Sequence, residues 1–285
     1  MYTRILVATG GSPWSDAAVA YAIALAMHMR AELCILTVLN VSGVYATPDV
    51  MTSSELLMES VEQQGQDLLA HATARATDAG VPHVAILKWG NVTETVLQTA
   101  AEEQCDLIVL GSRGLSGFKR LMLGSISNAV TAKAQCPVLV IKQPPPAVLS
   151  WRRVLVATGG SPWSDAAVDH ALELARAQQL VVCLLYVEPR RPRRTDSGLT
   201  SDAKNVLALA EARAAAAGVP YEAKLAHGDV TTMILDTATQ QQCDVIVLGS
   251  RGLTGFKRLM LGSISNAIAA TAPVPVLIVK RFLLP

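Results

Sequence analysis

Three glycines spaced three residues apart follow an apolar run in the first half of the chain, and this pattern could hold a phosphate group. They are Gly111, Gly114 and Gly117, and a helix is predicted to begin shortly afterwards at Gly124-Ser125. Glycine lets the backbone approach a ligand without a Cβ in the way. The free N–H groups and the positive dipole end of a helix's first turn attract anions. These residues therefore predict an anion site built from main-chain donors.

The same pattern occurs twice. The segment CDLIVLGSRGLSGFKRLMLGSISNAV at 105–130 recurs at 243–268 with three conservative changes. The segment RILVATGGSPWSDAAVAYAIALA at 4–26 recurs at 153–175 with five changes. The chain is therefore expected to contain two similar domains, each with its own candidate site.

Apolar runs alternate with helix-compatible segments around these loops. The strands predicted in the first half are 4–9, 32–40, 81–88, 106–110 and 137–142, and the helices are 13–29, 52–79, 92–104 and 125–134. Such alternation is typical of a parallel sheet with helices on both faces. The second half repeats the plan, so we predict an α/β protein with domains at 1–143 and 152–285 and a proline-rich linker at 144–151.

The order of the strands decides where a ligand would bind. Ligands of open parallel sheets bind at the carboxyl ends of the strands, where the winding direction reverses, and the common orders place the first strand beside the third or the fourth. If it lies beside the fourth, the turn at 9–11 and the loop at 111–124 flank one crevice. The turn at 158–160 and the loop at 249–262 then flank a second.

Composition argues against several functional classes. Of the 285 residues 51% are hydrophobic, and 24 basic and 23 acidic side chains give a formal charge of +1. A chain so close to neutral has no overall electrostatic field that would hold nucleic acid or an anionic membrane. We interpret the basic run 190–194 as a solvated loop. The apolar runs are too short to span a bilayer, and the first strand begins too early for a signal peptide. We therefore expect a cytoplasmic protein.

No catalytic or metal-binding constellation is recognisable in the sequence. The five cysteines have no CxxC or Cys/His ligand spacing and are expected to be small core residues, and the five histidines are scattered. The glycine loop is neither a Walker A motif, which needs Lys-Ser or Lys-Thr after its glycines, nor GxGxxG. A pyrophosphatase-type Ser-Gly-Gly-x-Asp-Ser loop would need an aspartate that the segment 9–14 lacks.

The loop resembles the signature of the universal stress protein family, G-x-x-G, nine residues and G-Ser/Thr. Residues 111–125 fit this signature, and residues 249–263 fit it again. The resemblance covers nearly the whole chain and implies two tandem five-stranded parallel sheets of order 3-2-1-4-5 with helices on both faces. It also implies that the ligand is ATP or another adenine nucleotide, with or without Mg²⁺.

Carried over by position, the resemblance implies a nucleotide site in each half. The implied residues of the first half are Thr9, Gly10, Val38, Leu110, Gly111, Arg113, Gly114, Gly124, Ser125, Ile126 and Ser127. Those of the second half are Thr158, Gly159, Val187, Leu248, Gly249, Arg251, Gly252, Gly262, Ser263, Ile264 and Ser265. In this scheme Gly111, Arg113 and Gly114 wrap the ribose and first phosphates, while Val38 and Leu110 line the adenine slot. The start of the following helix holds the phosphates through its amides and serine hydroxyls.

One position departs from the family pattern. ATP-binding relatives usually have an aspartate after the first strand that contacts the nucleoside, whereas this chain has Gly10 and Gly159 there. A hydrogen bond to a charged group is worth about 1.5–3 kcal/mol, or about 10- to 150-fold in affinity. We therefore expect lower selectivity for the base and the ribose, with unchanged binding of the phosphates. The pairs at 119–120 and 257–258, Lys-Arg in each loop, are interpreted equally well as phosphate contacts or as solvated surface.

Three functions remain open at this point. The first is a stress-response or regulatory protein that binds adenine nucleotide with little or no catalysis. The second is a scaffold without a ligand, and the third is a slow nucleotide hydrolase. The resemblance also implies that the last strands, 138–142 and 276–280, pair with each other, since apolar sheet edges need covering. We expect a pseudo-twofold pairing of the two domains, with a homodimer as a further step.

Overall fold

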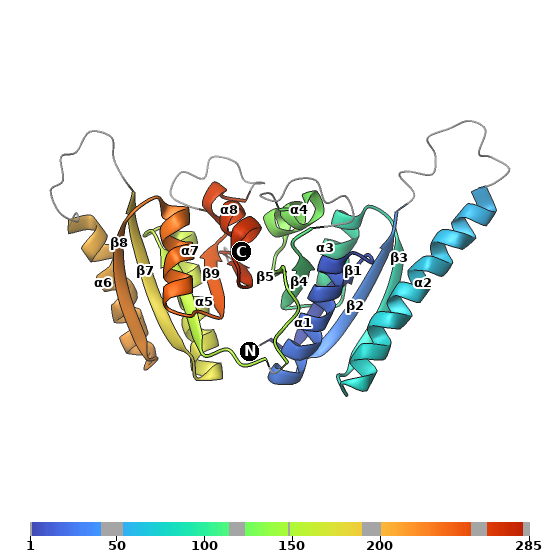
Figure 1. Cartoon of the computed structure of the whole chain (residues 1–285), viewed down its shortest axis with the longest axis horizontal. Coiled ribbons are helices and arrows are strands. Elements are labelled where there is room, and N and C mark those ends of the chain that lie inside the picture. The colour runs from blue at the N-terminus through green and yellow to red at the C-terminus, as the bar shows by residue number, and fades with distance from the viewer. Residues whose placement is uncertain are drawn as a thin grey trace. The chain divides into compact units, whose positions relative to one another are not determined.

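A computed structural model describes residues 2–40, 54–113, 123–147, 149–189, 201–251 and 261–281, with only the backbone for residues 54–57. The chain divides into two compact units, one mostly from residues 2–149 and the other mostly from residue 150 onward (Figure 1). Each unit is described separately below.

The described residues of the first unit form a five-stranded parallel sheet with four helices. Its elements are β1 (Arg4–Thr9), α1 (Pro13–Met29), β2 (Glu32–Leu39), α2 (Ser54–Asp78), β3 (His83–Trp89), α3 (Val92–Glu102), β4 (Leu107–Gly111), α4 (Ser125–Lys133) and β5 (Val138–Ile141). The strand order is β3-β2-β1-β4-β5, and each neighbouring pair is parallel. This confirms the order 3-2-1-4-5.

The second unit repeats this plan. Its elements are β6 (Arg153–Thr158), α5 (Pro162–Gln178), β7 (Val181–Pro189), α6 (Ser201–Ala217), β8 (Tyr221–Gly228), α7 (Val230–Gln240), β9 (Val245–Gly249), α8 (Ser263–Thr271) and β10 (Val276–Val279). The order β8-β7-β6-β9-β10 is that of the first unit, again with parallel pairs. The predicted fold class of two tandem α/β sheets is therefore correct.

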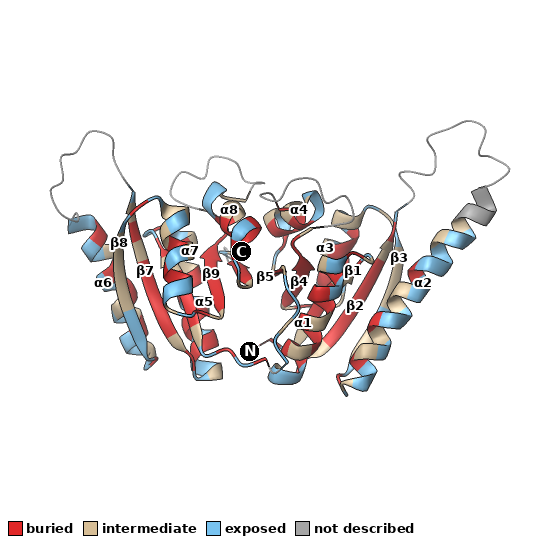
Figure 2. Cartoon of the chain, viewed as in Figure 1, coloured by how far each residue is buried: buried red, intermediate tan, exposed pale blue. Residues whose placement is uncertain are grey.

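Helices cover both faces of each sheet. In the first unit α1 contacts α2 over one face, and α3 contacts α4 over the other. All residues of β4 and β5 are buried, as expected for strands covered on both sides, whereas the edge strand β3 is partly exposed (Figure 2).

The first and fourth strands are neighbours in both units. In the first unit Ile5 pairs with Leu107 and Val7 with Val109. The connections after β1 and β4 lead to helices on opposite faces of the sheet, so the winding direction reverses between these strands. The crevice predicted at the carboxyl ends of the first and fourth strands therefore has its structural basis in each unit.

Candidate anion-binding sites

Serine hydroxyls engage several backbone donors of the turn after β1. Ser12 caps α1, and Pro13 follows at the first helical position, where no N–H is needed. The Ser15 hydroxyl oxygen accepts from the backbone N–H groups of Ser12 at 2.9 Å and Gly10 at 3.4 Å, while Ser12 Oγ accepts from Ser15 N at 3.1 Å. The amides of Gly10, Ser12 and Ser15 are thus engaged by serine hydroxyls. Sequence reasoning missed Ser15, although a serine three residues after the cap is a capping-box pattern.

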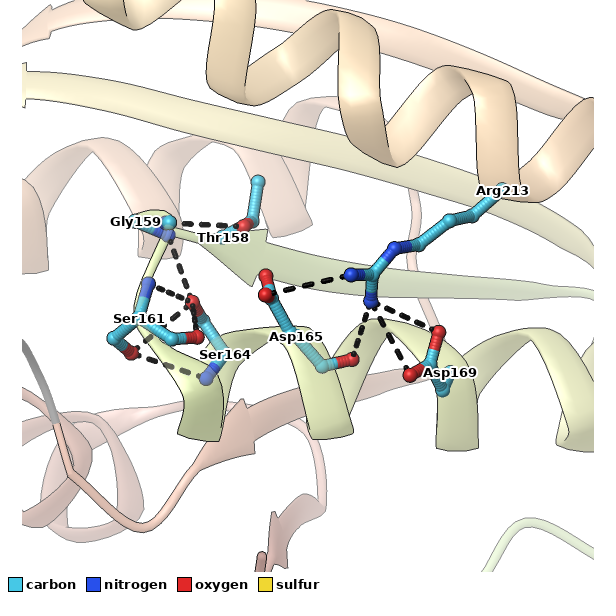
Figure 3. A network of polar contacts seen from close by, with 8 residues as sticks. Thr158, Gly159, Ser161, Ser164, Asp165, Asp169 and Arg213 are labelled. Carbon is cyan, nitrogen blue, oxygen red and sulfur yellow. Dashed lines mark hydrogen bonds and ion pairs between the residues drawn. The ribbon is translucent and has the colours of Figure 1, made fainter.

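The second unit has the same turn and an additional ionic clamp behind it (Figure 3). Ser164 Oγ accepts from Ser161 N at 2.9 Å and from Gly159 N at 3.2 Å. Arg213 of α6 pairs with Asp169 at 3.1 Å and with Asp165 at 3.4 Å, both on α5. These side chains are partly exposed, so the pairs contribute at most about 1 kcal/mol each, but they tie α6 to the helix that starts at the turn.

Gly111 allows the end of β4 to approach α1 closely. A Cβ on Gly111 would lie 2.5 Å from the carbonyl oxygen of Trp14, and one on Gly249 would lie at the same distance from that of Trp163. No side chain can be accommodated there without a backbone shift. The glycine is therefore explained by packing, and its predicted contact with a ribose or phosphate stays a prediction.

A backbone hydrogen bond joins the two ends of the glycine-rich loop. Gly124 N donates to Ser112 O at 2.8 Å, and in the second unit Gly262 N donates to Ser250 O at 2.9 Å. This hydrogen bond, which we call the loop neck, also places the start of α4 or α8 beside the end of β4 or β9. Gly114, Gly252 and the loop Lys-Arg pairs lie outside the described residues.

The helices that follow the loops begin without a side-chain cap. The N-cap of α4 is Gly124, with φ −57° and ψ 149°, and that of α8 is Gly262, with φ −59° and ψ 145°. Neither glycine can satisfy the first-turn N–H groups, which have no partner within a helix. These amides, unlike those after β1, are not engaged by a cap and suit an anion.

The serines at these helix starts have different environments. Ser125 is exposed and is the first helical residue, after the N-cap Gly124. Ser127 is buried, and its hydroxyl donates to Gly111 O at 2.7 Å; Ser265 donates to Gly249 O at 2.8 Å. The Ser127 proton thus ties α4 to β4, which leaves its oxygen only as an acceptor and opposes the predicted donation to a phosphate.

The arginine next to the loop neck in each unit stacks on a tryptophan at the start of α1 or α5. The guanidinium of Arg113 lies over the Trp14 ring, 5.6 Å from its centroid, and Arg251 lies over Trp163 at 5.7 Å. Such cation–π pairs hold the arginine near the rim of the crevice. Ile126 at the second helical position is 40% exposed, and Ile264 is 39% exposed. Both predicted arginines therefore lie directly beside the loop neck.

The residues predicted for an adenine slot lie on the α4 face of the sheet. Leu39 of β2 points toward Gly65 of α2, so Val38 points to the opposite face. Gly111 faces α1, so Leu110 also points away from α1, toward the α4 side. The second-unit equivalents, Val187 and Leu248, are both buried.

The ends of the first strands contribute Thr9 and Thr158, each 6% exposed, and then Gly10 and Gly159. A Cβ on either of these glycines would meet no atom within 4 Å, and neither has a positive φ. The Cβ of an aspartate would therefore have room here. The site thus offers donors for phosphates, but its β1 turn presents no carboxylate to the nucleoside.

The cysteines and the side chains that could bind a metal are the remaining groups with possible chemistry. Four of the five cysteines are buried, as expected for core residues. Among the residues that the structure describes, no cluster of three or more His, Cys, Asp or Glu side chains is placed to hold a metal. In the same part of the chain, no helix is both long and apolar enough to cross a membrane.

Comparisons with known proteins give consistent results. The family model described as "Universal stress protein family" matches residues 1–142 and 150–280. A universal stress protein of Mycolicibacterium smegmatis is 28% identical over 289 residues, covering 97% of this chain and 96% of its own. Universal stress protein YxiE of Bacillus subtilis is 34% identical over 150 residues, covering 50% of this chain and 100% of its own.

Solved structures share the fold. The crystal structure of a universal stress protein from Archaeoglobus fulgidus has a TM-score of 0.76 at 24% identity and covers 98% of both chains. A universal stress protein in complex with cAMP matches 50% of this chain and 97% of its own, with 25% identity and a TM-score of 0.37. At this identity the Archaeoglobus likeness concerns the fold.

Proposed function

The chain belongs to the universal stress protein family, and from this premise we propose that each unit binds ATP or another adenine nucleotide, with or without Mg²⁺, in the crevice between its first and fourth strands. The biological role that we propose is that of a cytoplasmic stress-response or regulatory protein with little or no catalysis. Nucleotide binding would bias the conformation or assembly of the chain.

One observation supports this proposal above the others. In each unit a helix without a side-chain cap starts beside the end of the fourth strand. After the first strand, by contrast, the Ser15 hydroxyl engages the amides of Gly10 and Ser12, and the Ser164 hydroxyl engages those of Gly159 and Ser161. Among the described residues, the first-turn amides of α4 and α8 are therefore the donors that we propose for the phosphates. In this proposal Arg113 and Arg251 add positive charge at the rim, and Val38 and Leu110 contact the base.

Titration calorimetry of the full chain with ATP, ADP and cyclic AMP tests the proposal. The matched variant is Gly124→Asp combined with Gly262→Asp. Aspartate is a favoured N-cap, and the backbone angles of both glycines are compatible with it, so its carboxylate should occupy the first-turn amides while stabilising each helix by a few tenths of a kcal/mol. We expect nucleotide binding by the parent and none by this folded variant.

Failure of the parent to bind any of these nucleotides at millimolar concentration would contradict the proposal. The scaffold without a ligand would then be favoured, and the observation behind it is the open space at Gly10 and Gly159, where a nucleoside-contacting carboxylate would fit. Steady multiple-turnover release of phosphate or pyrophosphate would instead indicate the nucleotide hydrolase.

Assembly is part of the same proposal. The sequences of the last strands, VLVI in β5 and VLIV in β10, are wholly apolar. We propose that these strands bring the two domains, 1–143 and 152–285, into a pseudo-twofold pair, and that chains can associate further into homodimers. Small-angle scattering and light scattering check both steps. Two independently tumbling domains would contradict the pairing.

A further inference from the structure

In each unit, an arginine that follows the fourth strand lies over a tryptophan at the start of the first helix. Trp14 lies in the first turn of α1, two residues after the cap Ser12, and Trp163 lies at the same place in α5. The guanidinium of Arg113 is 5.6 Å from the centroid of the Trp14 ring. Arg251 lies over Trp163 at 5.7 Å. Both distances are within the roughly 6 Å over which a cation and an aromatic ring attract each other.

The backbone of Trp14 is held in place on two sides. Ser12 and Ser15 form a capping box around the first turn of α1, and Figure 3 shows the equivalent serines of α5. The carbonyl oxygen of Trp14 lies against Gly111, where a Cβ would be only 2.5 Å away. Neither contact involves the indole ring, so we expect a change of the Trp14 side chain to leave the turn intact.

The backbone around Arg113 is held as well. Its neighbour Ser112 donates to Ile141 O at 2.7 Å and accepts from Gly124 N at 2.8 Å, which is the loop neck. Ser12 Oγ donates to the carbonyl oxygen of Arg113 in a long hydrogen bond of 3.5 Å. Because the backbone is held at both ends of the contact, the ring and the guanidinium meet with little further loss of backbone freedom.

The turn after the first strand thus reaches the site differently from what the family resemblance implies. Gly10 presents no carboxylate to a nucleoside. Trp14, four residues later, contacts Arg113, which lies beside the loop neck from which α4 begins. A guanidinium is always charged, and its planar set of N–H donors matches phosphate oxygens. An aromatic ring therefore links this turn to the place where phosphates are proposed to bind.

We propose that Trp14 and Trp163 are positioning residues for phosphate binding, each holding its arginine beside the loop neck so that the guanidinium contacts the phosphate chain. The inference rests on the proposed function and extends it, since it assigns the first-strand turn to the phosphates rather than to the nucleoside. The tryptophan acts only through the arginine. ATP and inorganic tripolyphosphate should therefore depend on it equally.

Titration calorimetry of the full chain with ATP and with inorganic tripolyphosphate tests this role. The substitutions Trp14→Leu and Trp163→Leu are made together, so that the two sites stay alike. A cation–π contact at an exposed site is worth about 0.5–1 kcal/mol, so we expect both ligands to bind about two- to fivefold more weakly. Trp14→Phe with Trp163→Phe keeps an aromatic ring under each arginine and should retain most of the affinity.

A double-mutant cycle separates positioning from a general structural effect. Arg113→Gln with Arg251→Gln removes the charge, and we expect it to weaken both ligands about tenfold or more, the worth of a hydrogen bond to a charged group. In this arginine-free background the two leucine substitutions should cause no further loss, because the ring then has nothing to hold. Trp89→Leu is the matched control. Trp89 is 42% exposed on the edge strand β3, so its replacement should leave both affinities unchanged.

The outcomes separate the two proposals. Binding of ATP with the same affinity by the parent and by the leucine variant would overturn the positioning role and leave nucleotide binding intact. An equal loss in the parent and in the arginine-free background would also overturn it, because the tryptophan would then act independently of the arginine. Binding of tripolyphosphate that depends on the tryptophan and arginine together, with no binding of ATP, would support the positioning role and contradict the nucleotide assignment. If neither ligand binds, both proposals fail.

Discussion

Gly10 and Gly159 stand where the family resemblance implies an aspartate, and the structure leaves room for a Cβ at both positions. Each is exposed, has an ordinary φ, and would place a Cβ in open space. The neighbouring Gly11 is different, because its φ of +72° favours glycine and its Cβ would lie 3.0 Å from Leu68. The turn itself therefore depends on Gly11 and tolerates a side chain at Gly10.

Replacement of both open glycines, Gly10→Asp with Gly159→Asp, should restore a contact to the nucleoside. We expect affinity for ATP to rise about 10- to 150-fold, the worth of a hydrogen bond to a charged group. Affinity for tripolyphosphate should not rise, because it has no ribose. Competition calorimetry measures both, with the double asparagine variant as the uncharged control. Equal changes for the two ligands would show that this turn does not contact the nucleoside.

Gly111 and Gly249 test the distinction between packing and ligand contact. Alanine at either position would force its Cβ against the backbone of α1, so we expect Gly111→Ala to lower the free energy of unfolding by about 1–3 kcal/mol without any ligand present. Gly10→Ala is the control and should have little effect on stability. Urea denaturation gives both values. An unfolding free energy unchanged by Gly111→Ala would refute the packing explanation.

At the scale of single elements, α5 carries a partly buried histidine, His170, whose titration should affect acid stability. Burial lowers the pKa of His170 to about 4, well below its ordinary value of 6.5. The unfolded chain therefore binds a proton between these two values that the folded chain does not. Stability from this residue is complete above pH 6.5 and is lost as the pH falls toward 4, by up to about 3 kcal/mol.

The internal repeat supplies the matched variant for this prediction. Tyr21 of α1 occupies the position equivalent to His170 of α5 and is buried. The substitution His170→Tyr should therefore fit the second unit and remove its part of the acid-induced loss of stability. Thermal denaturation between pH 4 and pH 7 measures this, with exposed His227→Gln as the control. A parent and His170→Tyr variant with the same pH dependence would contradict the assignment.

The elements show what sequence reasoning could and could not find. The alternation of strands and helices and the repeated loops predicted the fold class and the placement of the carboxyl-end crevice. The capping of the β1 turn by Ser15 is a local pattern that sequence reasoning missed. The approach of Gly111 to Trp14 could not be predicted, because it joins segments almost 100 residues apart. Both contacts show that groups which looked available for a ligand instead make contacts within the protein.

At the scale of the whole molecule, the two units differ in their outer contacts and agree in their candidate sites. The clamp from Arg213 to Asp169 has no counterpart in α1, where Ala20 stands at the equivalent position. The loop neck, by contrast, measures 2.8 Å in one unit and 2.9 Å in the other, and the buried serine donors measure 2.7 and 2.8 Å. Divergence after duplication has thus left the described parts of both sites alike.

This likeness predicts two bound nucleotides per chain. Because the helix-start geometry is the same in α4 and α8, the two sites should have affinities of the same order. Gly124→Asp alone and Gly262→Asp alone should each reduce the stoichiometry from two to one while leaving the other site's affinity unchanged. Calorimetric titration of protein at known concentration gives these numbers directly. A parent that binds one nucleotide, lost in only one of the two variants, would show that the sites have diverged in function despite their common backbone.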